Sequence, residues 1–369
     1  MNFKFNSKTL FCELKTIVKS SLKKILYYFS IVSLAVTGTT TAKAADGDAA
    51  TGEVTTGQAL SATDANGILF DADGNGALAY SIDPNGGITI GTTNDADAMT
   101  TASTGASIIT VTVTDSSGNN DVLTIAGDIT MEDNDNDDTL AIVSTNANLL
   151  IQNDVVSNSS GADISFSLGS GSDVVMTVDH DVNEAQDIAA TIDGNATNTV
   201  TLRVTDTVGT AQTTTFKNAI GGTVALDAII LGFTDEEEVK VAFDAAVSAT
   251  AITLGDATDA DSDTLTVTFE AQAADHTVTG TIDNAIAADE TAIHVLDATA
   301  SQAPDTVTFA SNIGSTIAVD AITVGSASAG GDAIFSGNVS ATAFNVLGGD
   351  HANEDNKADM DGNLTAAVT

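Results

Sequence analysis

The chain carries the segment TFKNAIGGTVALDAIILG at residues 215–232 and repeats it as TFASNIGSTIAVDAITVG at residues 308–325. Ten of the 18 positions are identical at an offset of 93 residues. The likeness continues on both sides, because the TID of residues 191–193 recurs at 281–283 and the VSATA of residues 247–251 recurs at 339–343. A fixed period of this kind indicates a repeat protein, with a unit of about 90 residues.

Short runs rich in β-branched residues follow one another along the chain, each closed by Asp, Asn, Gly or Ser. This pattern predicts β-strands. Residues 239–247 fit a helix or a strand, and we favour the strand because the corresponding part of the second copy contains Gly337. The runs are ITVTVT (109–114), VLTIAG (122–127), TLAIVS (139–144), ISFSLG (164–169), VVMTVD (174–179), TVTLRV (199–204), TLTVTF (264–269), AIHVLD (292–297) and TVTFAS (306–311).

Two all-β architectures can house such a repeat. A parallel β-solenoid stacks short strands in coils, and tandem Ig-like β-sandwich domains of about 90 residues have the same period. We favour the solenoid, because the chain has no tryptophan and only two prolines. The expected units are residues 173–262 and 263–358, with a third copy starting at 359. Since the last residues continue a predicted strand, we expect a fragment of a longer protein or a form that assembles through its open end.

The first 44 residues have the order of a secretory signal peptide. A lysine-rich leader precedes the apolar run 25–36, and small residues end at Ala44, where cleavage is expected. The apolar run is shorter than the roughly 20 residues that span a bilayer. The sequence therefore predicts a protein secreted to the cell surface or the medium. Residues 45–107 follow as an acidic segment with turn signals such as Asn66-Gly67, and we expect it to be irregular.

The charge is strongly negative, at −40 for the whole chain. Seven of the 11 Lys and Arg residues and one of the 51 Asp and Glu residues lie in the leader, so residues 45–369 carry 4 − 50 = −46. Such a polyanion repels nucleic acids and anionic lipids, and we expect no nucleic-acid partner. The single cysteine, Cys12, also lies in the leader, which excludes disulfides and thiolate sites from the rest.

Acidic residues at alternate positions resemble the first half of a calcium-binding loop. One group is followed by the turn residue Gly76 but has Ile82 where the bidentate glutamate is needed. Another has the full spacing and ends at Glu270, with Thr264 in place of the turn glycine. Solvated turns are the alternative explanation. The candidate Ca²⁺ ligands are Asp71, Asp73 and Asn75; Asp133, Asp135 and Asp137; Asp259, Asp261, Asp263 and Glu270; and Asp359, Asp361 and Asn363.

No other motif indicates chemistry. The four histidines are far apart in the sequence and lack metal-ligand spacing, so we expect them in strands or on the surface. There is no G-x-S-x-G and no phosphate-binding glycine motif. The sequence therefore predicts no catalytic residues and no enzyme, although a polysaccharide-active β-helix enzyme is the least favoured alternative.

Stretches such as GNVSATAFNV (337–346) and STIAVDAITVG (315–325) resemble bacterial β-strand-repeat surface proteins: S-layer-like proteins, repetitive adhesins and autotransporter passengers. The resemblance implies export, cell-surface display and, in many members, calcium-dependent assembly. We therefore expect a structural coat or filament protein that associates with itself. The alternative is an adhesin stalk that contacts the cell envelope or an extracellular polysaccharide.

Overall fold

The structure is a computed structural model, and the residues that it describes lie between 52 and 368. The described residues form strands and no helix. They are residues 52–54, 68–72, 76–82, 88–90, 99–103, 107–115, 118–119, 121–133, 139–157, 163–169, 171–179, 184–207, 212–232, 238–255, 264–272, 274–287, 290–297, 305–326, 329–347 and 356–368.

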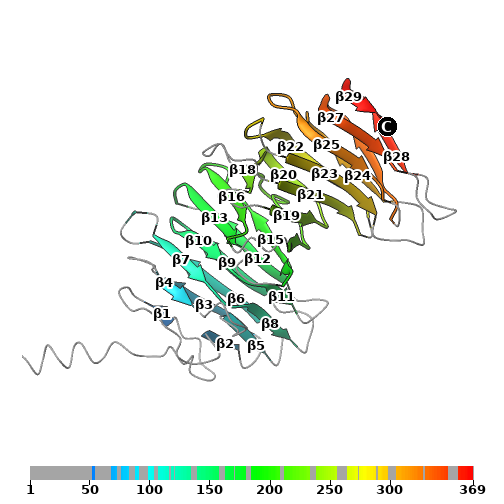
Figure 1. The fold of residues 1–369 in the computed structure, drawn as a ribbon. Coiled ribbons are helices and arrows are strands. Elements are labelled where there is room, and N and C mark those ends of the chain that lie inside the picture. Colours follow the sequence, from blue (N-terminus) through cyan, green and yellow to red (C-terminus); the bar gives the residue numbers. More distant parts are fainter. Residues whose placement is uncertain are drawn as a thin grey trace, which may run out of the picture. The chain divides into compact units, whose positions relative to one another are not determined.

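The strands form three parallel sheets that stack coil upon coil (Figure 1). The six-stranded sheet contains β1 (Gly52–Val54), β3 (Gly76–Ile82), β6 (Ser107–Val113), β9 (Thr139–Ser144), β12 (Asp163–Leu168) and β15 (Ala190–Asp193). The 11-stranded sheet contains β4 (Ile88–Ile90), β7 (Val122–Ile125), β10 (Asn148–Ile151), β13 (Val174–Asp179), β16 (Val200–Thr205), β18 (Leu226–Leu231), β20 (Val247–Leu254), β22 (His276–Asn284), β24 (Thr306–Phe309), β26 (Asp332–Phe335) and β28 (Lys357–Met360). The 12-stranded sheet contains β2 (Ile68–Ala72), β5 (Met99–Ser103), β8 (Ile129–Asp133), β11 (Val155–Ser157), β14 (Gln186–Ile188), β17 (Thr213–Phe216), β19 (Glu238–Phe243), β21 (Thr264–Ala271), β23 (Glu290–Asp297), β25 (Val319–Val324), β27 (Val339–Val346) and β29 (Leu364–Val368).

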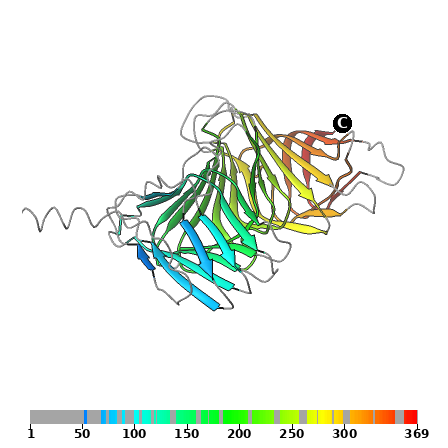
Figure 2. The same cartoon turned by 90° about the horizontal axis from the view of Figure 1, so that it is seen from below.

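Each strand pairs in parallel with the equivalent strand of the next coil, and Figure 2 shows this succession from below. The coil length varies, from 22 residues between Val319 and Ala341 to 35 between Ile88 and Leu123. This arrangement is a parallel β-solenoid, so the predicted fold is confirmed. Every run that the sequence analysis predicted as a strand contains one, and residues 238–243 form strand β19 as expected.

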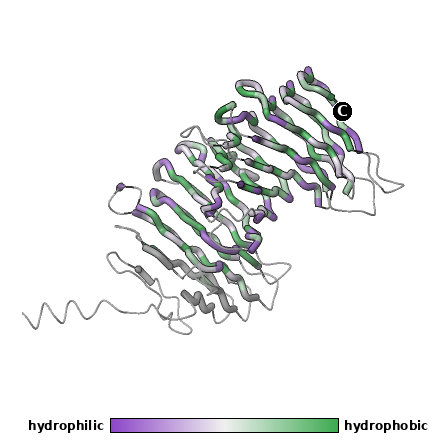
Figure 3. Tube along the Cα trace, viewed as in Figure 1, coloured by the Kyte–Doolittle hydropathy of each residue, from purple (hydrophilic) through white to green (hydrophobic). Residues whose placement is uncertain are grey.

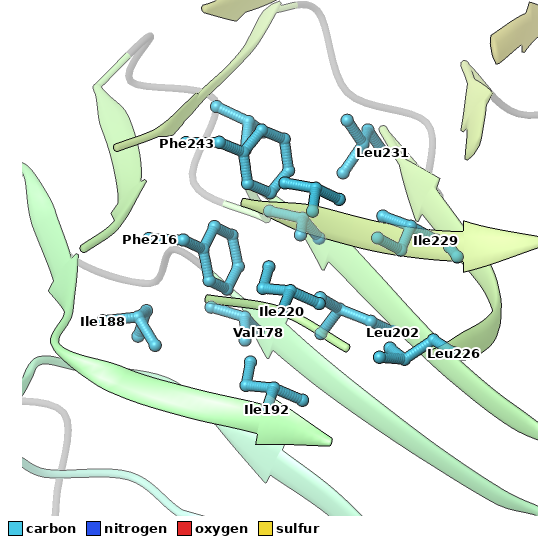
Figure 4. Packing of buried hydrophobic residues seen from close by; sticks show 14 of the residues in the cluster. Val178, Ile188, Ile192, Leu202, Phe216, Ile220, Leu226, Ile229, Leu231 and Phe243 are labelled. Carbon is cyan, nitrogen blue, oxygen red and sulfur yellow. The ribbon is translucent and has the colours of Figure 1, made fainter. Parts of the chain in front are cut away.

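Alternation along each strand builds the core, because successive side chains point to opposite sides of a sheet. In β21 the residues Leu265, Val267 and Phe269 are almost fully buried, and the threonines between them are partly exposed. Hydrophilic residues recur at the bends between strands (Figure 3). Inside, Phe216 and Phe243 lie side by side among Ile188 and Ile220 (Figure 4), with ring centroids 5.3 Å apart.

Three rows of paired core residues run through the later coils, and we name them rows A, B and C. The long strands β20 and β22 contribute to two rows each, since each crosses a bend. Row A is Ile192, Ile220, Val247, Val278, Phe309, Phe335 and Met360. Row B is Leu202, Ile229, Ile252, Ile282, Ile313, Val339 and Leu364. Row C is Ile188, Phe216, Phe243, Phe269, Val295, Val324 and Val346.

The 93-residue repeat does not equal a whole number of coils. Thr215 pairs with Ala242, Ala242 pairs with Thr268, and Thr268 pairs with His294, so His294 lies three coils after Thr215. Thr308 lies in β24, the strand that follows the strand of His294. The second copy is therefore displaced by one row, so that Phe216 of row C corresponds to Phe309 of row A. The predicted units of about 90 residues thus span three coils and one additional side, and their boundaries stay a prediction.

The structure differs from the sequence-based expectation for residues 45–107. Instead of an irregular segment, its described residues include strands β2 to β5 and the start of β6. Residues 68–72 pair with 99–103, and 76–82 pair with 107–113, each in parallel. These strands are short and lie among turn signals, and their partners are about one coil away. Local patterning therefore could not identify them.

Candidate functional site

Side chains of Asp and Asn at the bends accept hydrogen bonds from backbone N–H groups of the neighbouring coil. The N–H of Thr199 donates to Asp173 Oδ1 at 2.8 Å, and the N–H of Thr306 donates to Asp275 Oδ1 at 2.7 Å. A bend interrupts the strand ladder, so these side-chain oxygens supply acceptors that a neighbouring strand does not, and such a hydrogen bond contributes about 0.5–1.5 kcal/mol. The same contact is made by Asp154, Asp193, Asp227, Asp283, Asp320, Asn146, Asn148, Asn312, Asn338 and Asn356.

Some of the negatively charged side chains have a structural role, because they accept these hydrogen bonds between coils. Carboxylates make charge-assisted hydrogen bonds, which are stronger than those of neutral acceptors. Asparagine takes the same position at other levels of the stack, for example Asn148, which accepts the N–H of Val175 at 2.8 Å. Because either residue serves, what these bends require is an oxygen acceptor.

The repeated segments build the same bend twice. The N–H of Thr223 donates to Asp193 Oδ1 at 2.8 Å, and the N–H of Thr316 donates to Asp283 Oδ1 at 2.7 Å. Beside them Gly221 has a φ of +66° and Gly314 a φ of +67°. At either glycine a Cβ atom would lie 2.1 Å from the carbonyl oxygen of a serine in the next coil. Only glycine fits such a position.

A second cluster, the charged corner, consists of Lys217, Asp244, Glu270 and His276. The first three residues each follow one of the stacked phenylalanines of row C, in three successive coils. Lys217 Nζ lies 3.4 Å from Asp244 Oδ2 and 3.4 Å from Asp187 Oδ1. The side chain of Asp244 is only 5% exposed, so this ion pair is largely shielded from water on one side.

The charged corner shifts the pKa of its members. Burial, repulsion from Asp244 and repulsion from Asp297 raise the pKa of Glu270, although Lys217 acts against them. Burial lowers the pKa of Lys217, but Asp244 and Asp187 outweigh it and raise that pKa above its ordinary value.

His276, the fourth member of the charged corner, lies at the start of β22 and is 9% exposed. Burial lowers the pKa of His276, while the nearby charges of Asp244 and Asp275 act in the opposite direction. In the described part of the chain, His276 Nε2 and Asp244 Oδ1 are buried and have no hydrogen-bond partner. The corner therefore favours a neutral imidazole.

The chemistry open to this corner is limited by its contacts. Asp244 is buried and ion-paired, which closes it to a substrate, and burial raises the pKa of Glu270. Through Lys217 the arrangement links three successive coils, because Lys217 pairs with Asp187 and with Asp244.

Six of the 13 predicted calcium ligands lie in the described residues. Glu270 lies in the charged corner, Asp359 pairs with Lys357, and the N–H of Asn363 donates to Asn338 Oδ1 at 3.0 Å. The N–H of Asp361 donates to Phe335 O at 2.9 Å, Asp71 lies in β2 and Asp133 in β8. Within the described ranges, no three Asp, Glu, His or Cys side chains are grouped so that they could hold a metal ion. Outside these ranges lie Asp73, Asn75, Asp135, Asp137, Asp259, Asp261 and Asp263.

The sequence analysis did not single out Lys217, Asp244 or the environment of His276. A signal was present, because the pairs Phe216-Lys217, Phe243-Asp244 and Phe269-Glu270 recur at the coil spacing of 27 and 26 residues. His276 and His294 lie in strands, as expected, and His180 and His351 lie outside the described residues.

Comparison of the chain with protein-family models, curated proteins and solved structures gave no match. The described residues contain no helix long and apolar enough to cross a membrane. The assignment of a parallel β-solenoid therefore rests on the strand pairing of the described residues.

Proposed function

We propose that this protein is an exported structural protein of the cell surface, a coat or filament subunit built as a solenoid. The observation that carries the proposal is the apolar core of rows A, B and C, which passes through successive coils with backbone pairing between each coil and the next. In such a stack each coil contacts only its neighbours, so the module can be extended by adding coils. The bends supply further hydrogen bonds between coils.

Export is the second part of the proposal. The leader at residues 1–44 and the lack of cysteine after it support passage to an oxidising compartment. N-terminal sequencing of the protein from its native cells tests this part. The mature chain is expected to begin at Ala45 and to fractionate with the cell surface or the medium. An intracellular chain that begins at Met1 would overturn it.

Calcium-dependent self-association is the third part. A net charge of −46 after the leader makes close approach of two copies unfavourable unless cations reduce the repulsion. Because the described residues hold no metal cluster, the candidate ligands are the acids outside them, above all Asp259, Asp261 and Asp263. Ca²⁺ would bind these carboxylates through hard oxygen ligands.

Electron microscopy of the purified chain with Ca²⁺ and with a chelator tests the assembly. Sheets or filaments that dissolve on chelation are expected. The triple variant D259N/D261N/D263N should need more Ca²⁺ to assemble. The matched control removes three other charges, with D163N, E290Q and D305N, and should assemble as the unmodified chain does. Monomers under every condition would reject the coat and favour the alternative, an adhesin stalk.

A further inference from the structure

Four Asn-x-Ser/Thr tripeptides occur in the chain, beginning at Asn158, Asn195, Asn338 and Asn363. This tripeptide is the acceptor of N-linked glycans and belongs to surface loops of exported proteins. The transferring enzyme must reach the asparagine amide and the hydroxyl two residues later. The fold therefore decides which tripeptide can react, and Asn158 lies outside the described residues.

The tripeptide at Asn195 forms a bend between β15 and β16. Ala196 and Thr197 are exposed, and Asn195 is partly exposed. Asn195 Oδ1 accepts hydrogen bonds from the N–H of Thr197 at 2.9 Å and from its hydroxyl at 2.7 Å. The bend thus brings the amide and the hydroxyl together. These bonds use the side-chain oxygen and leave the amide nitrogen Nδ2 as the group available for reaction.

Bonds to neighbouring coils lie on both sides of this tripeptide. Before it, the N–H of Gly194 donates to Val224 O at 2.9 Å. After it, Asn198 Nδ2 donates to Gly169 O at 2.6 Å, and the N–H of Thr199 donates to Asp173 Oδ1. Residues 195–197 therefore form a short loop whose two flanks are hydrogen-bonded to neighbouring coils. The loop can move away from the surface while the hydrogen bonds between the strands stay intact.

The tripeptides at Asn338 and Asn363 are held differently. The N–H of Asn338 donates to Asn312 Oδ1, and the following residues Val339 and Ser340 donate to the coils on either side. Asn363 uses both its N–H and its Nδ2 as donors to Asn338 Oδ1, at 3.0 and 3.1 Å. Both tripeptides run into strands, β27 and β29, so an enzyme that enclosed them would have to break inter-coil hydrogen bonds.

We propose that Asn195 is an acceptor for an N-linked glycan. The donor class is an oligosaccharide linked through pyrophosphate to a lipid. Nδ2 of Asn195 forms a bond to C1 of the first sugar, the bond from C1 to the pyrophosphate oxygen breaks, the amide gives up one proton, and the lipid pyrophosphate leaves. In the cell this step rests on the proposed export, since the enzyme acts on exported chains.

The test uses the purified, folded full chain with membranes that contain an oligosaccharyltransferase and a lipid-linked oligosaccharide. Intact mass and glycopeptide sequencing locate the product, and synthetic peptides spanning each tripeptide report reactivity without the fold. Among the three tripeptides that the structure describes, we expect modification of the folded chain at Asn195 to be about tenfold faster than at Asn338 or Asn363. The three peptides should differ less among themselves.

The variants N195Q and T197A should each abolish the product located at residue 195, whereas N338Q should leave that product unchanged. Denaturant unfolding checks that N195Q folds as the unmodified chain does. An unmodified folded chain, with a reactive Asn195 peptide, would overturn the proposal, and so would equal modification at Asn338. Because this assay needs no export and no assembly, its outcome is independent of the proposed coat function.

Discussion

The two copies of the repeated segment, residues 215–232 and 308–325, build the same bend on different sides of the solenoid. Phe216 stacks on Phe243 in row C, with the rings inclined by 16°, and Phe309 stacks on Phe335 in row A, with the rings inclined by 4°. The two stacks meet where Phe269 contacts Phe309 edge to face, at 5.2 Å. The local sequence thus specifies a bend, and the number of residues between copies decides which side it occupies.

The two copies differ at the residue that follows the first phenylalanine. Lys217 of the first copy pairs with Asp187 and Asp244, whereas the second copy has Ala310 at this position. The charged corner is therefore an addition to the shared bend. Changes at shared positions should act alike in both copies, and changes at the charged corner should depend on pH.

The largest effects are expected in the phenylalanine stacks. F243A and F335A should each lower the free energy of unfolding by about 3–5 kcal/mol, because a large buried side chain is replaced by a cavity. Denaturant unfolding followed by circular dichroism measures this loss. T268A, an outward substitution next to Phe269, is the control and should change it by less than about 0.5 kcal/mol. Tolerance of one phenylalanine substitution but not the other would show that the stacks are not equivalent.

Next come the glycines of the shared bend. G221A and G314A should each destabilise the protein by about 1–3 kcal/mol through backbone strain alone, and by more because Cβ meets a carbonyl oxygen. The matched control is G222S, since the second copy carries Ser315 at the corresponding position. Unfolding should change little in this control. Unequal losses at Gly221 and Gly314 would contradict the identity of the two bends.

The carboxylates of the shared bend should have a smaller effect. D193A and D283A each remove the acceptor of N–H groups of the next coil, and the expected loss is about 0.5–1.5 kcal/mol because water reaches these exposed bends. D193N and D283N should recover most of it, because asparagine oxygens already serve at other bends. Hydrogen exchange at Thr223 and Thr316 would report the broken contacts locally. Unchanged protection in the alanine variants would show that these bonds contribute nothing.

The smallest effects belong to the charged corner. Since the folded-state pKa of Glu270 is raised, its ionised form destabilises the fold above that pKa, and the penalty disappears once the pH falls below the unfolded-state value of about 4.3. E270Q should therefore be more stable than the unmodified protein at pH 7, by less than about 1 kcal/mol because the site is partly exposed. The two proteins should become equal near pH 4. A constant difference across this range would exclude the ionisation as its cause.

His276 should act with the opposite sign. Its folded-state pKa is lowered, so the unfolded chain takes up the proton first, and stability is lost as the pH falls below about 6.5. H276Q should remove this part of the acid sensitivity while leaving that of Glu270. Unfolding free energies from pH 7.5 to 5 measure it. The same slope in H276Q and the unmodified protein would show that the pKa of His276 does not differ between the folded and the unfolded chain.

Much of the fold could be predicted from the sequence, and little of the candidate site. The alternation of runs such as TLTVTF identified the strands, and the 93-residue repeat identified a stacked architecture. The charged corner was missed because Lys217, Asp244 and Glu270 are separated by one coil each. The Asp-rich bends suggested cation ligands, since a carboxylate in a turn has the same sequence pattern whether it binds a cation or an N–H group of the next coil.

By itself, the sequence determined that this chain forms short strands with one apolar side, closed by turns rich in Gly, Asp and Asn. These properties are local, because they depend on alternation and on backbone conformation. Only the tertiary structure decided which strands are neighbours, that the second copy lies one row away from the first, and that the tripeptide at Asn195 lies in a bend between two strands. Such outcomes depend on register between residues about one coil apart, and register follows from the packing of the whole core.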